Sequence, residues 1–255
     1  MEVYDVERVS SGIKGLDELL SGGFPKGKCV LVVGGPGSGK TIFAMQFLKS
    51  GAEMDEAGLY ITLDETPDQI KEEMSSLGWD LEGLERSGKL FLLDATQLRR
   101  VKGSPPGSYV KTSSQAFATR LPELTLQSLI ETTVKLVEEE DVQRVAIDPI
   151  TALTIRYGET LRRRRAVLRL FDALSNTGCT SIITSELRSS LLERRFQVEE
   201  FLSQGVIILH TILHGGDVVK AIQIEKMRGI KHDTQLRPYI ITESGIEVYP
   251  KDKVF

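Results

Sequence analysis

A glycine-rich loop followed by lysine and threonine carries the clearest chemistry in this 255-residue sequence. Gly34–Thr41 reads GGPGSGKT and matches G-x-x-x-x-G-K-[ST] at every fixed position. Glycines let successive backbone N–H groups turn inward around a phosphate. Lys40 would supply charge to the β- and γ-phosphates, and Thr41 a hydroxyl ligand for Mg²⁺. The loop predicts a nucleoside triphosphate site formed by Gly35, Pro36, Gly37, Ser38, Gly39, Lys40 and Thr41.

The sequence around this loop supports the same interpretation. The apolar run Cys29–Val33 precedes it and predicts a strand buried on both faces. Thr41–Met54 follows with the apolar spacing of a helix, whose positive dipole end would face the phosphates. The alternative is a glycine-rich turn that contains Lys-Thr by chance, and it leaves this strand and helix unexplained.

Asp148 is the candidate for a second magnesium ligand. It ends the apolar run Val145–Ile147, and ligand sites in open α/β sheets lie at the carboxyl ends of strands. A carboxylate there can bind Mg²⁺ together with the hydroxyl of Thr41. The alternative is a strand-ending aspartate in a turn before Pro149.

Two adjacent carboxylates, Asp64 and Glu65, follow another predicted strand, Leu59–Leu63. Their mutual repulsion can raise one pKa towards the range useful for a base that activates water. Alternatively, they favour the dipole of the helix that follows. From the residues alone, these two interpretations are equally supported.

The elements that must position these residues alternate between strand and helix. Further apolar runs predict strands at Leu90–Leu93 and Thr180–Thr184. Helical patterns occupy Pro67–Leu77, with Thr66 as its N-cap, and Pro122–Glu140 and Leu161–Leu174. Near the carboxyl end, strands are predicted without intervening helices at Val206–Leu213, Val218–Ile224 and Tyr239–Ile241, with a hairpin turn at His214–Asp217. The sequence therefore predicts one α/β domain over residues 1–255, with a mostly parallel sheet extended by antiparallel strands.

Composition narrows the class of protein further. The net charge of −4 argues against a globally basic nucleic-acid binder, and no apolar run approaches a membrane span, so we expect a cytoplasmic protein. Cys29 and Cys179 are predicted to be buried strand cysteines in a reducing compartment. The segment 95–121, rich in Gly, Pro, Ser and Thr, interrupts the strand–helix rhythm and predicts a functional or mobile loop.

Several segments together resemble the KaiC-like ATPases of the RecA/RadA superfamily. The resemblance begins with Ser11–Leu20 (SGIKGLDELL) and Gly22–Gly27 (GGFPKG), which lead into the phosphate loop. It continues with Leu63–Pro67, Thr184–Glu186 and Lys226–Gly229 (KMRG), in the same order and over nearly the whole chain. Clock-type KaiC proteins carry two such domains, whereas this chain has one phosphate loop and resembles a single-domain relative.

The resemblance implies a RecA-like core that assembles into a ring, typically a hexamer, with ATP and Mg²⁺ between subunits. Glu65, helped by Asp64, would activate water, and Asp148 would be the Walker B carboxylate. Lys226 and Arg228 would reach the ATP of the neighbouring subunit. Without the resemblance, this last pair is better interpreted as solvated residues on an edge strand. Asp64 stands where the family usually has glutamate, and its side chain is one methylene shorter.

A cluster of arginines raises the question of nucleic-acid binding. Residues 156–195 hold nine arginines and four acidic residues, a local net charge of +5. In RecA-like rings the corresponding loops face the central channel, where they could neutralise the phosphates of single-stranded DNA. Alternatively, the arginines form a solvated helix face that pairs across a subunit interface. The candidates for DNA contact are Arg162, Arg163, Arg164, Arg165, Arg188, Arg194 and Arg195.

Two functions are therefore considered. The first is a ring-forming, Mg²⁺-dependent ATPase that acts on or regulates DNA transactions related to recombination. The second is an ATP-dependent signalling or assembly module with slow hydrolysis, for which segment 103–119 could be the partner surface. Autokinase activity is not supported, because no serine or threonine stands in a distinguishing context.

Overall fold

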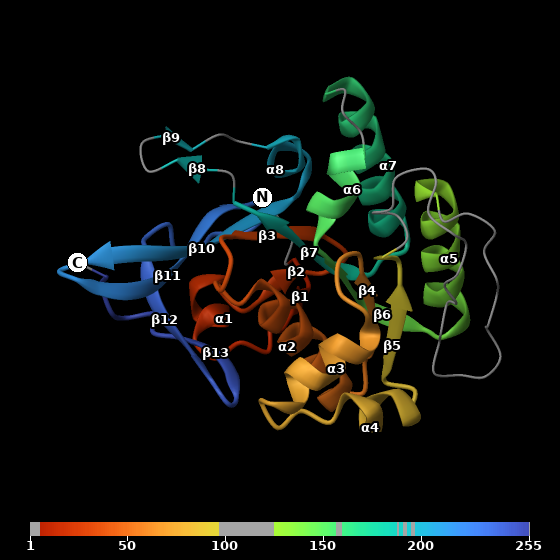
Figure 1. The fold of residues 1–255 in the computed structure, drawn as a ribbon, viewed down its shortest axis with the longest axis horizontal. Helices are drawn as coiled ribbons and strands as arrows, with labels where there is room; N and C mark the ends of the chain where they lie inside the picture. Colours follow the sequence, from red (N-terminus) through yellow and green to blue (C-terminus); the bar gives the residue numbers. More distant parts are fainter. Residues whose placement is uncertain are drawn as a thin grey trace.

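A nine-stranded sheet runs through the protein in a computed structural model that describes residues 6–96, 125–156, 160–187, 189–190, 193–194 and 197–254 (Figure 1). The strand order is β13-β12-β11-β10-β3-β7-β6-β4-β5. The strands are β3 (Cys29–Gly34), β4 (Ala57–Thr62), β5 (Leu90–Asp94), β6 (Val142–Asp148), β7 (Thr180–Glu186), β10 (Gly205–His214), β11 (Asp217–Met227), β12 (Arg237–Thr242) and β13 (Gly245–Val248).

The parallel part of the sheet confirms the prediction from the apolar runs. β10, β3, β7, β6, β4 and β5 are parallel to one another, and β10 is antiparallel to β11 on its other side. Every residue of β3 is buried, as expected for a strand with helices on both faces. The carboxyl ends of β3, β4, β6 and β7 consequently meet at one edge of the sheet.

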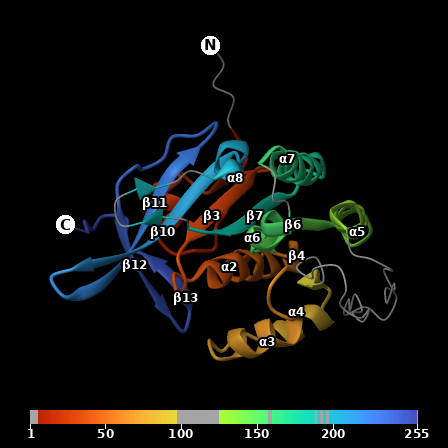
Figure 2. The same ribbon diagram turned by 45° about the horizontal axis from the view of Figure 1, so that its top comes forward.

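Helices cover both faces of this sheet (Figure 2). α2 (Lys40–Glu53) and α3 (Pro67–Ser75) pack their apolar side chains on one face, and α5 (Leu126–Glu139) and α7 (Thr160–Asn176) on the other. The remaining short elements are β1 (Arg8–Val9), α1 (Leu16–Leu19), β2 (Phe24–Pro25), α4 (Leu81–Arg86), α6 (Ile150–Arg156), β8 (Ser189–Ser190), β9 (Glu193–Arg194) and α8 (Val198–Leu202). The layers are those of a mostly parallel α/β fold.

The last third of the chain adds the antiparallel strands predicted from the sequence. β10 and β11 form a hairpin whose turn contains Gly215 and Gly216, both with positive φ. β12 and β13 continue the antiparallel order beyond β11. β13 was not predicted from the sequence. The parallel pairing of β10 with β3 was not predicted either.

Short helices were missed, whereas the longer ones were predicted. Thr66 caps α3 and forms a capping box with Gln69, as its position before Pro67 had suggested. α4, α6 and α8 were not predicted, because five to seven residues give too little periodicity to recognise. Of the predicted loop 95–121, only Ala95 and Thr96 belong to the described residues, and the proposed partner surface 103–119 lies outside them.

Both cysteines are buried and free. Cys29 begins β3 and Cys179 directly precedes β7. Burial raises the pKa of the Cys29 thiol to about 11, so this thiol is not activated for chemistry. Within the described residues, every helix is too short or too polar to cross a lipid bilayer.

Candidate functional site

The glycine-rich loop joins the carboxyl end of β3 to the amino end of α2, as predicted. Gly37 and Gly39 have φ values of 68° and 88°, which favour glycine. A Cβ atom added at Gly35 or Gly37 would meet no atom within 4 Å, so the backbone of the loop is open on that side. At Gly39, by contrast, an added Cβ would lie 2.8 Å from Ile241 Cδ1. The loop therefore has an open cradle at its tip and tight packing where α2 begins.

Lys40 lies folded against this loop. Its Nζ donates hydrogen bonds to the carbonyl oxygens of Gly34 at 3.0 Å and Gly35 at 2.9 Å. Burial lowers the pKa of the Lys40 ammonium, while the charges of Asp148 and Glu186 act in the opposite direction. The ammonium is thus held at the loop by two neutral acceptors, which a phosphate could replace with charge-assisted bonds.

The loop is also fixed from the antiparallel part of the sheet. The buried Tyr239 hydroxyl of β12 donates to the carbonyl oxygen of Ser38 at 2.7 Å. Lys220 of β11 donates to the carbonyl oxygen of Gly37 at 2.5 Å. Leu209 of β10 pairs with Gly34, the last residue of β3. The β10–β11 hairpin continues past this pair, and Lys220 pairs with Thr211 two residues further along β10. The hairpin therefore extends over the loop. Nothing local in the sequence distinguishes Lys220 from any other strand lysine, so its contact with the loop could not be predicted.

Asp148 is the centre of a hydrogen-bonded group at the carboxyl end of β6. Its Oδ2 accepts hydrogen bonds from Thr41 Oγ1 at 2.7 Å and from the Tyr60 hydroxyl at 2.6 Å. Its Oδ1 accepts a hydrogen bond from Thr184 Oγ1. Asp148 is buried, and the donors come from α2, β4 and β7. The structure thus brings Thr41 and Asp148 together across 107 positions in the sequence.

The donors at this point match the preferences of magnesium. A threonine hydroxyl and a carboxylate stand in contact beside the glycine-rich loop, and Mg²⁺ prefers such hard oxygen ligands, completing its shell with water and phosphate. The open backbone at Gly35 and Gly37 leaves space for phosphate oxygens. Thr41 and Asp148 are therefore suitable for holding Mg²⁺ with a nucleotide.

Asp64 and Glu65 lie just beyond the carboxyl end of β4, at the same edge. Thr62, the last residue of that strand, pairs with Asp148 and also donates to the carbonyl oxygen of Glu65. Burial raises the pKa of the Glu65 carboxyl, and the charges of Glu73 and Asp148 add to the effect. Asp64 is exposed. The sequence left the two carboxylates equivalent, and the structure separates them by environment.

Thr184, Ser185 and Glu186 end β7 next to the glycine-rich loop, since Glu186 pairs with Gly34. Their side chains differ in surroundings. Thr184 contacts Asp148, Ser185 is buried and donates to Glu199 Oε1 of α8 at 3.3 Å, and Glu186 is exposed. The polar end of β7 thus contributes to the Asp148 group through Thr184.

Lys226 and Arg228 do not join this group. Lys226 pairs with Val206 near the amino end of β10. Gly34 of the loop pairs with Leu209, three residues further along β10. Its ammonium donates to the carbonyl oxygens of Glu200 and Ser203, at 2.6 and 2.7 Å. Burial lowers the pKa of Lys226, and the nearby charge of Arg228 lowers it further. Within one chain, the Lys226 side chain is therefore directed away from the phosphate loop, and Arg228 lies just beyond the end of β11.

The predicted arginine cluster is described only in part. Arg162, Arg164 and Arg165 are exposed near the start of α7, whereas Arg163 is half-buried. Consecutive residues point around a helix, so the four side chains do not share one face. Arg188 and Arg195 lie outside the described residues, and of Arg194 the structure describes its place in β9.

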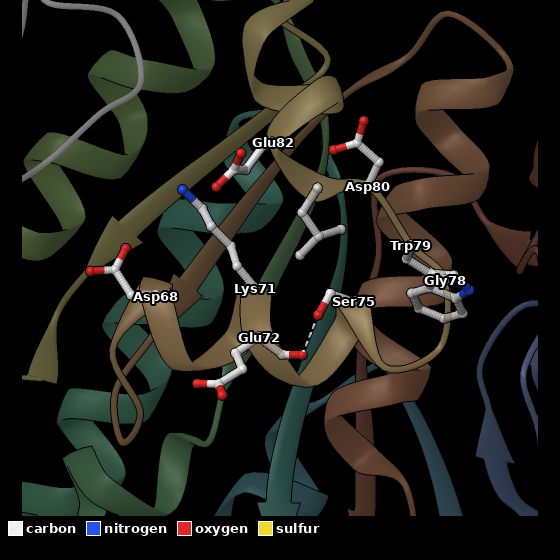
Figure 3. A pocket seen from close by; sticks show the side chains of 9 residues that line it. Asp68, Lys71, Glu72, Ser75, Gly78, Trp79, Asp80 and Glu82 are labelled. Atoms are coloured by element: carbon white, nitrogen blue, oxygen red, sulfur yellow. Dashed lines mark hydrogen bonds between the residues drawn. The ribbon is translucent and has the colours of Figure 1, made fainter.

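A pocket of about 590 Å³ lies between α3 and α4, away from the loop (Figure 3). Its lining includes four acidic residues and comprises Asp68, Lys71, Glu72, Ser75, Gly78, Trp79, Asp80, Leu81 and Glu82. None of these residues belongs to the phosphate loop or to the Asp148 group. The pocket is therefore separate from the candidate site.

Comparison with known proteins decides the family. Residues 9–253 match the protein family described as "ATPase: KaiC". This chain belongs to the KaiC family of ATPases. The KaiC-type fold agrees with a crystal structure of a KaiC-like protein from the hyperthermophilic archaeon Pyrococcus horikoshii OT3, at 34% identity and a TM-score of 0.79. That similarity covers 96% of this chain and 100% of the other.

Relatives of this KaiC-family chain differ in length. A UPF0273 protein of Pyrococcus furiosus is 36% identical over 253 residues, which cover 98% of this chain and 96% of the relative. The circadian clock oscillator protein KaiC of Picosynechococcus is also 36% identical, over 250 residues, but these cover only 45% of its length. The KaiC/RecA-type P-loop fold expected from the sequence is thus confirmed, and the clock protein is about twice as long as the matching region.

Proposed function

We propose that this chain binds ATP with Mg²⁺ and hydrolyses it. The observation that carries the proposal is the hydrogen bond between Thr41 and Asp148, 2.7 Å long, beside an open glycine-rich loop. A loop that only made a turn would not require a buried carboxylate against its threonine. Mg²⁺, held by Thr41 and Asp148, would neutralise phosphate charge.

Each residue of the site then has a defined task. The backbone of Gly35 to Lys40 and the ammonium of Lys40 bind the phosphates, and Thr41 and Asp148 hold the cation. Glu65 takes a proton from the attacking water, and its raised pKa brings it closer to the range of an effective base. Asp64, exposed and one position earlier, is a secondary candidate.

We further propose that Lys226 and Arg228 act on the ATP of a neighbouring subunit, in a ring. The support is their position, since Lys226 contacts α8 rather than its own phosphate loop. Arg228 is exposed and free to reach across an interface. An added cation at the transferred phosphoryl group accelerates hydrolysis in other ATPases with such residues. In this proposal residues 1–255 work as one domain, because all these groups lie on β3, β4, β6 and β11 of one sheet or on the segments that directly follow these strands.

DNA is a second element of the proposal. Three exposed arginines at the start of α7 give a local positive charge in an acidic chain. Such a surface could bind the phosphates of single-stranded DNA, and the binding would weaken as salt is added. The alternative, a module that controls a protein partner, uses the same ATP site.

The test is ATPase turnover measured with and without single-stranded DNA at two salt concentrations. We expect Mg²⁺-dependent turnover that Asp148→Asn abolishes. Stimulation by DNA that disappears at high salt would support the DNA element, and its absence together with no DNA binding at low salt would refute that element alone. No turnover with Mg²⁺-ATP at any protein concentration would contradict the proposed hydrolysis.

A further inference from the structure

The Asp148 carboxylate has more partners than binding a cation requires. Thr41 comes from the phosphate loop, whereas Tyr60 and Thr184 come from the strands on either side of β6. Tyr60 and Thr184 are fully buried, so neither can contact a nucleotide directly. In the part of the chain that the structure describes, their hydroxyl groups are donors to Asp148.

Tyr60 reaches Asp148 because of the register of β4 and β6. Tyr60 pairs with Ala146, and Asp148 lies two residues further along on the same face of β6. The small Ala146 side chain leaves room for the Tyr60 ring, which belongs to the apolar cluster that includes Phe43 and Phe47 of α2. The ring is thereby fixed, and its hydroxyl meets Asp148 Oδ2 at 2.6 Å.

We propose that Tyr60 is a positioning residue for Asp148 and thereby sets the affinity of the site for a divalent cation. This inference rests on the proposed magnesium site. Thr41 must share its hydroxyl between the carboxylate and the cation, whereas Tyr60 has no such second task. Its hydrogen bond holds Oδ2 in one orientation whether or not a nucleotide is bound. Partners that orient a metal ligand in this way often decide metal affinity.

Phenylalanine at position 60 would fill the apolar cluster equally well. The hydroxyl is thus not needed for packing, and a buried hydroxyl generally persists where it has a hydrogen-bond partner. The Tyr60 hydroxyl is buried with its ring and lies 2.6 Å from Asp148 Oδ2, so this hydrogen bond is a fixed part of the site.

The experiment titrates Mn²⁺ into the full chain loaded with a non-hydrolysable ATP analogue and follows free Mn²⁺ by electron paramagnetic resonance. We expect Tyr60→Phe to raise the Kd for Mn²⁺ by about tenfold. Binding of the nucleotide in EDTA should stay at the wild-type level and shows that the variant is folded. Thr184→Val, which removes the donor to Oδ1, should also raise the Kd and provides a second test if Tyr60→Phe does not fold.

Thr133→Val is the control. It also removes one buried hydroxyl, but that hydroxyl donates to the Leu129 carbonyl oxygen within α5, outside the loop and the Asp148 group. Its Kd for Mn²⁺ should equal that of the wild type. The inference is overturned if Tyr60→Phe binds Mn²⁺ like the wild type, or if Thr133→Val weakens Mn²⁺ binding as much as Tyr60→Phe. Asp148→Asn distinguishes a failure of the Tyr60 inference from a failure of the proposed magnesium site. Unchanged Mn²⁺ binding in that variant would refute the magnesium site itself.

Discussion

At the scale of single residues, the phosphate loop depends on Lys40. The ammonium is held by two carbonyl oxygens of its own loop, both 3.0 Å away or less. Those carbonyls have no net charge, so a phosphate offers the ammonium a stronger partner. Under the proposed function, a phosphate would replace these two carbonyl oxygens as the partner of the Lys40 ammonium.

Lys40→Ala should weaken ATP binding about tenfold to a hundredfold, because hydrogen bonds to charged groups are worth about 1.5–3 kcal/mol. Equilibrium binding of a fluorescent ATP analogue measures this loss. Lys28→Ala is the control, since Lys28 is exposed at the opposite end of β3. Equal affinity of the Lys40 variant and the wild type would contradict the phosphate contact.

Glu65 controls the expected pH dependence. Because its pKa is raised, the proposed base should become protonated at a higher pH than an ordinary glutamate. The protonated carboxyl cannot accept a proton, so kcat/KM should fall as pH falls through that raised pKa. Glu65→Gln should retain ATP binding and lose hydrolysis.

Glu73→Gln is the control for this profile. The charge of Glu73 raises the pKa of Glu65, so its removal should shift the acid limb to lower pH and leave hydrolysis intact. A Glu65→Gln variant with full activity would refute the assignment of the base.

At the scale of elements, α3 begins directly after the two carboxylates. Its capping box joins the Thr66 nitrogen to Gln69 Oε1 at 2.8 Å and the Gln69 nitrogen to Thr66 Oγ1 at 3.4 Å. The start of this helix fixes the chain direction after Glu65. The helix cap at Thr66 therefore also affects the geometry at the neighbouring Glu65.

Thr66→Ala should lower the free energy of unfolding by about 1 kcal/mol, because it removes the side-chain acceptor of the cap. Urea denaturation measures the change. Thr66→Ser keeps the hydroxyl and should restore most of the stability. If both variants are equally stable, the hydroxyl does not cap the helix in solution.

At the scale of the whole molecule, the site of one chain is incomplete under the proposed function. Lys226 and Arg228 lie towards the amino ends of the strands, whereas the phosphate loop lies at the carboxyl ends. An interface between copies would bring the two ends together. Arg228→Ala should therefore reduce hydrolysis without preventing assembly.

Mixing of two inactive variants tests this arrangement. Lys40→Ala subunits lack the phosphate contact, and Arg228→Ala subunits lack the cation offered to the neighbour. A mixture should regain part of the ATPase activity, since some interfaces combine an intact loop with an intact Arg228. Wild-type chains mixed with each variant serve as controls. No recovery in a mixture that forms mixed oligomers would show that Arg228 acts within its own chain or not at all.

The sequence by itself determined the local parts of this protein. Spacing and residue type were sufficient to predict the loop Gly34–Thr41, the apolar strands and the cap at Thr66. Each of these depends only on residues that are neighbours in the sequence. The KaiC-like motifs, read in order, also gave the family that the comparisons confirm. The proposed roles of Glu65, Lys226 and Arg228 stay predictions.

Only the tertiary structure decided which distant residues meet. Tyr60 contacts Asp148 through the pairing of β4 with β6, and Lys220 reaches Gly37 because β10 overhangs β3. Arg144, which the sequence shows as one charged residue in an apolar strand, is buried and donates to Glu56 and to the carbonyl oxygen of Phe47. Strand order and register set these contacts, and both arise from the packing of the whole sheet rather than from any local pattern.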